Sequence, residues 1–416
     1  MISEVIGGVL VGGVLLQLGL VCIESVRRGV GQRRQSDLAL ETLKTELEIM
    51  RDLRRKRADA ALPWNGYRKF LVSKKVVECT DVCSFYLTPH DKKPLSEFLP
   101  GQYLTFRLNI PGKGNPVIRC YSISDSPHHD AYRVTIKRIP PREAGAPPGI
   151  VSSFFHEQIQ EGEIVDVRAP SGQFFLDPTS QKPVVLIGSG IGVTTVLAML
   201  NTLVAQRSRR EIWFFYGVRN RAQHIMKEHL ETIVRENPNV RLIVCCSRPE
   251  RDYERGRDYH HEGRISIDLL KQTLPSNNFE FYVCGPGPMM RDLAEGLKEW
   301  GVPETNVHYE TFGPSSVKEV AVVGAAGIGA PAAFAVQFRK SGKTVDWSGE
   351  HANLLEFVEA HGINIPCGCR AGSCGTCQVA VFSGEIDYIA KSDFETNPGT
   401  RLTCIGAPKS DLVIDA

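Results

Sequence analysis

The stretch Cys369-Arg370-Ala371-Gly372-Ser373-Cys374-Gly375-Thr376-Cys377 decides how the C-terminal part of this chain folds. Four residues separate its first two cysteines, two separate the next pair, and Cys404 follows downstream. Thiolates are soft, strongly donating ligands, and this spacing is typical of the four cysteines that hold a [2Fe-2S] cluster. Gly372 and Gly375 allow the left-handed backbone that lets such a loop wrap closely, with its N–H groups toward the sulfurs.

Zinc binding and structural disulfides are the alternatives for these cysteines. Zinc sites usually pair two short Cys-x2-Cys knuckles, which is not this spacing. The 12 cysteines are sparse for 416 residues, which favours a reducing compartment over a disulfide scaffold. The stretch closely resembles the plant-type ferredoxin domain, which implies an α+β β-grasp fold for residues 332–416. The expected metal ligands are Cys369, Cys374, Cys377 and Cys404, and Cys367 is interpreted as a buried bystander.

The length of the chain predicts two to four domains, each with its own core. The formal net charge is +2, so no global field favours nucleic acid as a partner. Residues 5–23 carry no charge, and 19 helical residues span about 28 Å, close to the roughly 30 Å core of a bilayer. A cleaved signal peptide is the alternative, but Glu4 stands where a basic residue is expected and no Ala-x-Ala site follows.

Residues 1–25 are therefore predicted to be a single-pass transmembrane anchor in a lipid bilayer. Arg27, Arg28, Arg33 and Arg34 follow at once, and the positive-inside rule places the downstream domains on the cytoplasmic side. Residues 26–63 show leucines at helical spacing between charged residues. They are predicted to form an amphipathic helical spacer that ends at Pro63, with a short coiled coil as the alternative.

Residues 64–180 change to short alternating runs punctuated by Gly and Pro, such as 103–108 and 132–137, which predicts a small antiparallel β-barrel. The run Arg119-Cys120-Tyr121-Ser122 offers an aromatic face, hydroxyls and a cation, which a flavin with its phosphate requires. The segment 149–156 is typical of a helix N-terminus that can bind phosphate, or of an ordinary serine cap.

Together, these two segments resemble the flavin barrel of the ferredoxin-NADP reductase family. The resemblance implies bound FAD, with FMN as the alternative. The residues that it assigns to cofactor binding are Arg119, Tyr121, Ser122, Gly149 and Ser152.

Residues 181–315 contain near-continuous apolar runs separated by helical segments, which predicts an α/β doubly wound domain with a parallel sheet. A glycine turn follows the first run, where a pyrophosphate can lie on a helix N-terminus. The turn resembles the nicotinamide half of the same reductase family, except that Thr195 stands where the family usually has proline. The loss of proline is expected to loosen the turn slightly. The assigned cofactor-binding residues are Gly188, Gly190, Gly192, Thr194 and Gly285.

The same resemblance places Cys284 beside the nicotinamide ring and Glu310 near the flavin, so these two residues are the candidate catalytic residues. Cys284 is alternatively a buried structural cysteine, and Glu310 merely polar at a strand end. NADH and NADPH both remain open, because Arg248 is surrounded by acidic residues.

Residues 316–331 are predicted to be a small-residue linker that tethers the ferredoxin domain. The domain order is that of reductases resembling the phthalate dioxygenase type. We therefore expect electrons to pass from NAD(P)H through flavin and the [2Fe-2S] cluster to a membrane-associated acceptor protein such as an oxygenase or desaturase. A stand-alone quinone or flavin reductase and a redox-sensing module are the alternatives.

Overall fold

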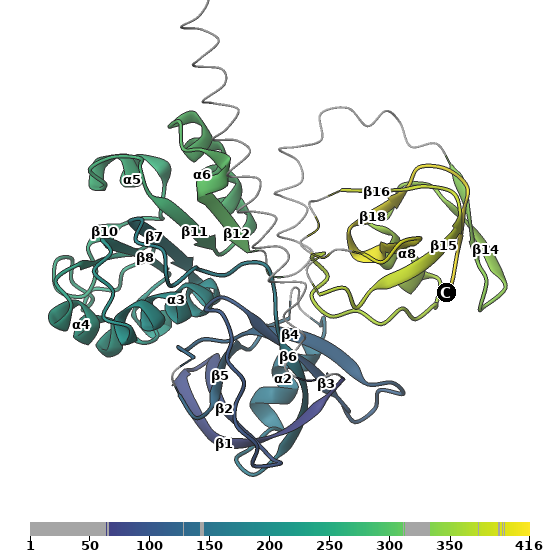
Figure 1. Cartoon of the computed structure of the whole chain (residues 1–416), viewed down its shortest axis with the longest axis horizontal. Coiled ribbons are helices and arrows are strands. Elements are labelled where there is room, and N and C mark those ends of the chain that lie inside the picture. Colours follow the sequence, from purple (N-terminus) through teal and green to yellow (C-terminus); the bar gives the residue numbers. More distant parts are fainter. Residues whose placement is uncertain are drawn as a thin grey trace, which may run out of the picture. The chain divides into compact units, whose positions relative to one another are not determined.

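The computed structural model describes residues 64, 66–127, 129–141, 145–310, 312, 333–372, 374–389, 392, 394 and 396–416 (Figure 1). The chain divides into two units, residues 1–63 and 64–416. The predicted anchor at 5–23, the spacer at 26–63 and the linker at 316–331 lie outside the described residues. Within the described ranges, no helix combines the length and the apolar character needed to cross a bilayer.

The first domain is a six-stranded antiparallel sheet that closes into a barrel. Its strand order is β4-β3-β6-β1-β2-β5, and an antiparallel bridge between Ile123 and Val134 joins the two ends. Phe155 of helix α2 (Ile150–Glu157) packs at 5.2 Å from Phe85 and 5.3 Å from Phe106, and so covers the barrel interior. The elements are β1 (Arg68–Cys79), β2 (Val82–Pro89), β3 (Tyr103–Leu108), β4 (Val117–Ser122), β5 (Tyr132–Lys137), α2 (Ile150–Glu157) and β6 (Ile164–Ser171).

The second domain is built on a parallel sheet of order β10-β9-β8-β7-β11-β12. The chain begins in the centre of the sheet at β7 (Val184–Ser189) and adds β8, β9 and β10 in turn toward one edge. It then crosses to the other side of β7, where it adds β11 and β12. The space between β7 and β11 is therefore the switch point of a doubly wound sheet. The other strands are β8 (Ile212–Val218), β9 (Val240–Cys246), β10 (His261–Glu262), β11 (Glu280–Cys284) and β12 (Val307–Glu310).

Helices cover both faces of this sheet, as Figure 1 shows. Alternate residues of β7 point to opposite faces, so Val184 and Leu186 join one apolar core while Val185 and Ile187 join the other. The helices are α3 (Val193–Ala205), α4 (Lys227–Glu236), α5 (Ile267–Thr273) and α6 (Gly287–Glu299), with short 3-10 turns at 190–192, 221–223 and 304–306. This confirms the predicted α/β domain.

The third domain is a mixed sheet of order β14-β13-β19-β15-β17 with a separate β16-β18 pair. Its helix α8 packs on the sheet through Phe357, whose ring lies 5.3 Å from that of Trp347. The elements are β13 (Phe334–Phe338), β14 (Lys343–Trp347), α8 (Leu354–Ala360), β15 (Gln378–Ser383), β16 (Ile386–Tyr388), β17 (Thr400–Leu402), a 3-10 turn at 403–405, β18 (Gly406–Pro408) and β19 (Leu412–Ile414). One helix across a mixed sheet agrees with the predicted α+β domain.

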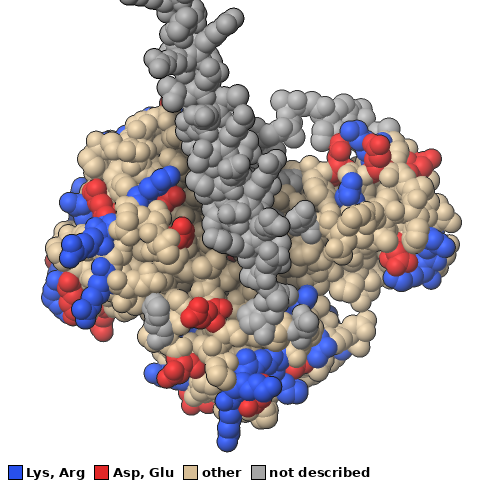
Figure 2. Space-filling view, viewed as in Figure 1, with Lys and Arg blue, Asp and Glu red and all other residues tan. Residues whose placement is uncertain are grey.

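Charged side chains of both signs are interspersed on the face of the molecule in Figure 2. This agrees with the near-neutral formal charge of the whole chain.

Candidate functional site

The candidate flavin-binding strand is β4, which pairs in antiparallel register with β3. Tyr121 is held by edge contacts with Phe106 at 5.8 Å and Phe155 at 5.4 Å. Burial raises the pKa of the Tyr121 hydroxyl well above its ordinary value, so this side chain stays neutral. The Arg119 guanidinium donates to the carbonyl of Ile118 at 2.7 Å. The strand thus supplies the phenol ring of Tyr121 in a fixed orientation and, two residues earlier, the cation of Arg119.

The N-terminus of α2 provides the predicted phosphate position. Gly149 is the N-cap in extended conformation, so the helix is not capped by a serine side chain. The Ser152 hydroxyl donates to the carbonyl of Gly149 at 3.0 Å and accepts from the N–H of Ile139 at 3.1 Å. A Cβ on Gly149 would lie 2.7 Å from Ser152 Oγ, so a larger residue would displace this turn.

The same helix terminus carries a polar atom without a partner. The buried hydroxyl of Ser153 makes no hydrogen bond within the described part of the chain. An unpaired buried hydroxyl is costly, and a helix N-terminus favours anions. The residues present therefore fit the phosphate end of a flavin nucleotide.

The glycine turn lies at the carboxyl end of β7, at the switch point. Gly190 has φ +54°, a left-handed conformation that favours glycine. A Cβ on Gly188 would lie 2.7 Å from Val193 Cα, and one on Gly192 would lie 2.4 Å from the carbonyl oxygen of Cys284. The turn therefore packs directly against the end of β11, and the Thr194 hydroxyl closes it by donating to the carbonyl of Ile191 at 2.9 Å.

A small hollow of about 20 Å³ lies beside this turn. Barrel residues contribute Asp81 and Lys137 to its lining, the turn contributes Gly190 and Ile191, and the end of β8 with the residue after it contributes Tyr216, Val218 and Arg219. A cleft at the carboxyl ends of parallel strands is where doubly wound domains bind dinucleotides. The hollow itself has room for about one water molecule, so the fit to a nicotinamide cofactor rests on the glycine turn at this edge of the sheet.

The two candidate catalytic residues are brought together by the register of β11 and β12, in which Cys284 is paired with Glu310. Cys284 is fully buried, and burial raises the pKa of its thiol well above the ordinary value, with the charge of Glu310 adding to the effect. The thiol is therefore neutral and suited to packing against a ring rather than to nucleophilic attack. Gly285 follows at the strand end, where a Cβ would lie 2.6 Å from Met289 Cε.

Glu310 accepts hydrogen bonds from two other elements at a single oxygen, Oε2. The Ser122 hydroxyl, at the end of β4, lies 3.5 Å away, and the Thr195 hydroxyl, in the first turn of α3, lies 3.0 Å away. The structure thus gathers the predicted residues Ser122, Cys284 and Glu310 into one place. It also adds Thr195, which sequence reasoning treated only as a missing proline, although a hydroxyl at that position was the available signal.

A second set of contacts fixes the barrel against the nicotinamide domain. Asp125 of the barrel pairs with Arg133 at 3.2 Å and accepts from the side-chain amide of Asn201, in α3, at 2.8 Å. The carbonyl oxygen of the same amide meets His229, in α4, at 2.8 Å. These contacts hold α3 in place, and with it Thr195.

Charged side chains of both signs lie beyond the ends of β8 and β9. Arg221 forms an ion pair with Asp252 at 2.8 Å, while the backbone of Arg248 is hydrogen-bonded to that of Arg219. Basic and acidic side chains therefore remain mixed beside the ends of β8 and β9.

The four predicted cluster ligands lie close to one another. The backbone N–H of Cys369 donates to the sulfur of Cys374 at 3.2 Å, and the N–H of Cys374 donates to the sulfur of Cys369 at 3.3 Å. The sulfurs of Cys377 and Cys404 lie 3.1 Å apart. Among the described residues, no three or more His, Cys, Asp or Glu side chains are already arranged as a metal site.

The chemistry of this donor set nevertheless fits a [2Fe-2S] cluster, because four thiols and inward N–H groups come from one loop and one distant segment. Gly372 and Gly375 have φ +79° and +69°, so the loop uses the left-handed freedom expected of them. Cys367 is half-buried rather than fully buried, and its sulfur faces Glu359 at 3.9 Å.

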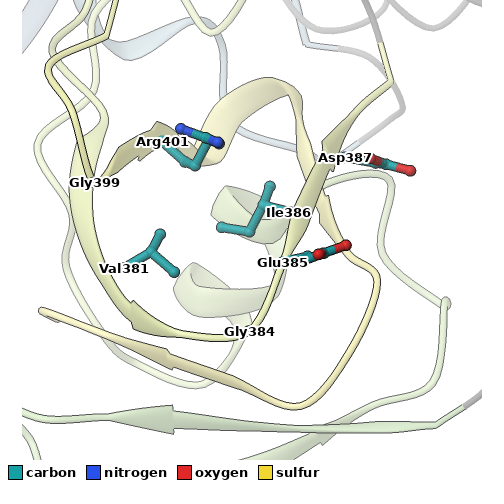
Figure 3. A pocket seen from close by; sticks show the side chains of 7 residues that line it. All are labelled: Val381, Gly384, Glu385, Ile386, Asp387, Gly399 and Arg401. Atoms are coloured by element: carbon teal, nitrogen blue, oxygen red, sulfur yellow. The ribbon is translucent and has the colours of Figure 1, made fainter.

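Figure 3 shows a separate hollow of about 380 Å³ in the third domain. Val381 and Ile386 point into it, while Glu385 and Asp387 point away. Its lining contains no cysteine, and Asp387 is paired with Lys409 at 3.0 Å. The described residues that line the hollow therefore include none of the predicted cluster ligands.

Comparison with known families assigns each domain. Residues 69–176 match the oxidoreductase FAD-binding domain, residues 186–295 the oxidoreductase NAD-binding domain, and residues 338–409 the 2Fe-2S iron-sulfur cluster binding domain. These matches confirm the three predicted cofactors and the order of their domains.

Similar proteins cover one or more of these domains. A flavohemoprotein of Halalkalibacterium halodurans is 39% identical over 252 residues, which are 61% of each chain. The chain thus spans about three-fifths of the length of the curated relatives it matches. The flavohem-like FAD/NAD binding domain of nitric oxide dioxygenase from Vibrio cholerae has a TM-score of 0.54 and 30% identity, over 60% of this chain and 100% of that one.

Phthalate dioxygenase reductase, described as a modular structure for electron transfer from pyridine nucleotides to [2Fe-2S], has a TM-score of 0.53 and 25% identity. The match covers 85% of this chain and 98% of that one, and so extends over all three domains. The chain is therefore an NAD(P)H-dependent oxidoreductase with FAD-binding, NAD-binding and 2Fe-2S domains in the order of that reductase.

Proposed function

We propose that this protein is a membrane-tethered reductase that passes electrons from NAD(P)H, through FAD and a [2Fe-2S] cluster, to an oxygenase or desaturase type of acceptor protein at the same membrane. The observation that carries the proposal is the domain order, which is shared over nearly the whole length of phthalate dioxygenase reductase. Both that reductase and the nitric oxide dioxygenase domain are named for oxygenase systems, which supports an acceptor of this class.

The residues of the chain divide the work between the domains. The glycine turn at 188–192 binds the pyrophosphate of the nicotinamide cofactor, and Cys284 packs beside the ring. Ser122 and Glu310 provide the polar groups at the place where the two cofactors meet. A flavin held by the barrel would supply the conversion between a two-electron hydride and the single electrons that a one-electron cluster requires. The four cysteines hold the cluster at the exit of the path.

The membrane part of the proposal rests on residues 5–23 and the arginines that follow them. An apolar run of this length suits a bilayer, and the basic flank suits the cytoplasmic side. A tether is useful because it confines the reductase and a membrane-bound acceptor to the same two-dimensional surface.

The electron path is tested by stopped-flow reduction of the purified full-length chain with NADH and, separately, with NADPH. The expected result is flavin bleaching followed by cluster reduction on the timescale of turnover. A cluster that stays oxidised during turnover would contradict the path and favour a redox-sensing module. Unchanged physiological activity in Cys374→Ser would instead favour a stand-alone quinone or flavin reductase.

The membrane tether is tested by flotation with vesicles of phosphatidylcholine and phosphatidylglycerol. The full-length chain is expected to float with the vesicles, and a chain lacking residues 1–35 is expected to remain at the bottom of the gradient. Both forms should reduce ferricyanide equally, because the truncation leaves the three domains intact. Equal flotation of both forms would refute the tether.

A further inference from the structure

Thr195 occupies a position that connects three elements of the active site. It lies in the first turn of α3 and is fully buried. Its hydroxyl donates to Glu310 Oε2 at 3.0 Å and lies 3.9 Å from the sulfur of Cys284. Because the buried Thr195 hydroxyl bonds to a carboxylate on another element, it belongs to the candidate site and does not serve only to stabilise the helix.

The neighbouring threonines of α3 show what an ordinary hydroxyl does in this helix. Thr194 donates to the carbonyl of Ile191 at 2.9 Å, and Thr202 donates to that of Ala198 at 2.7 Å. Such bonds to the preceding turn are the usual way to satisfy a helical threonine. Thr195 has the same residue type but bonds across to β12, a contact that links residues 115 positions apart.

Charge explains why this contact matters. A carboxylate is an acceptor, and donation from a hydroxyl stabilises its ionised form. Of the Thr195 and Ser122 hydroxyls, that of Thr195 lies closer to Oε2, at 3.0 Å compared with 3.5 Å. Within the described residues, the Cys284 thiol of β11 also faces this carboxylate, and burial keeps it neutral. On β12 itself, the ring of His308 stacks on Tyr282 at 4.5 Å.

We propose that Thr195 is a positioning residue that keeps Glu310 ionised and aimed at the junction of the flavin and nicotinamide sites. Proline, which the related glycine turns usually carry here, has no hydroxyl and cannot make this contact. The inference rests on the proposed function, because it assigns Glu310 to the site of hydride transfer from NAD(P)H.

The test compares Thr195→Val, which removes the hydroxyl at nearly constant shape, with Thr195→Ser, which keeps it. Thr202→Val is the matched control, because it removes a buried hydroxyl of the same helix that bonds only locally. The first readout is the pH dependence of the flavin midpoint potential, measured by dithionite titration without NAD(P)H. The second is the pH profile of flavin reduction by NAD(P)H.

Thr195→Val is expected to raise the pH at which Glu310 titrates by about one unit, the size of a lost charge-assisted hydrogen bond. The break in the plot of flavin potential against pH and the acid limb of the rate profile should both move to higher pH by that amount. Thr195→Ser and Thr202→Val should keep the wild-type curves, even where Thr202→Val lowers the melting temperature. Thr195→Pro should behave like Thr195→Val.

Two results would overturn the proposal. The first is that Thr195→Val gives the same curves as the wild-type protein. The second is that Thr195→Ser shifts the curves as much as Thr195→Val does, because the effect would then come from the changed shape of the side chain and not from the hydroxyl. Failure of the proposed function gives a different result. In that case NAD(P)H does not reduce the flavin of the wild-type protein, while the dithionite titration still reports on Thr195.

Discussion

Glu310 Oε2 lies 3.5 Å from the hydroxyl of Ser122, although 188 residues separate them in the chain. Ser122 ends strand β4 of the barrel, and Glu310 ends strand β12 of the doubly wound domain. The contact joins the last residue of the predicted flavin-binding strand to the edge strand of the doubly wound sheet. The candidate catalytic residue Glu310 therefore makes side-chain contacts in both domains.

Ser122→Ala is expected to slow flavin reduction by about tenfold, which corresponds to a lost hydrogen bond to a charged group of about 1.4 kcal/mol. Rapid-mixing absorbance at the flavin band measures this rate. The matched control is Ser84→Ala, which removes another buried barrel hydroxyl, one that is paired with Thr135 at 2.8 Å rather than with Glu310. An equal slowing in both variants would assign the effect to the stability of the barrel.

Cys374→Ser is expected to abolish the cluster, because a hydroxyl is a poor ligand for iron in place of a thiolate. Iron content and the electron paramagnetic resonance signal of the reduced protein should both fall to background, while ferricyanide reduction by NAD(P)H continues through the flavin. Cys367→Ser is the control and should retain full iron content. Loss of iron in Cys367→Ser would show that the ligand set is assigned wrongly.

Gly192→Ala should weaken nicotinamide binding and destabilise the switch point. Its Cβ would lie 2.4 Å from the carbonyl oxygen of Cys284, and overpacking of this kind costs about 1–3 kcal/mol. Cofactor titration and thermal melting measure the two effects. Gly114→Ala, where a Cβ would meet nothing within 4 Å, should change neither, so similar losses in both variants would contradict the steric explanation.

His224 is expected to make folding stability depend on pH. Burial, assisted by the charge of Lys227, lowers the pKa of His224 to about 4 from 6.5. The unfolded state therefore binds more protons between these values, and stability falls as the pH drops from about 6.5 toward 4. Between pH 7.5 and 5, the wild-type chain should lose about 2 kcal/mol more than His224→Gln in urea unfolding. Parallel losses in both proteins would exclude His224 as the cause.

Much of this architecture could be predicted because the deciding signals are local. The cysteine spacing at 369–377, the glycine turn at 188–192 and the alternating barrel runs each depend on a few adjacent residues. The parallel strands of the second domain were recognisable because burial on both faces demands continuous apolar runs.

The contacts that complete the site could not be predicted in the same way. The sequence marks Thr195 only by the absence of the usual proline, because its partner Glu310 is brought close by the register of β12 rather than by any local pattern. The Ser152 hydroxyl, likewise, hydrogen-bonds to the backbone at two places, the carbonyl of Gly149 and the N–H of Ile139. The residue type alone does not specify these two partners. Long-range register and side-chain direction decide both cases.

The position of Glu310 on the seam between two domains also bears on how the enzyme can be divided. A barrel ending near Leu176 would contain Ser122 but no carboxylate for it, and a doubly wound domain beginning near Val184 would contain Glu310 and Thr195 without the serine. Neither fragment alone would hold the complete hydrogen-bonded set. If the two halves are produced separately and then mixed, the rate of flavin reduction that returns would therefore measure how much of the protein has reassembled.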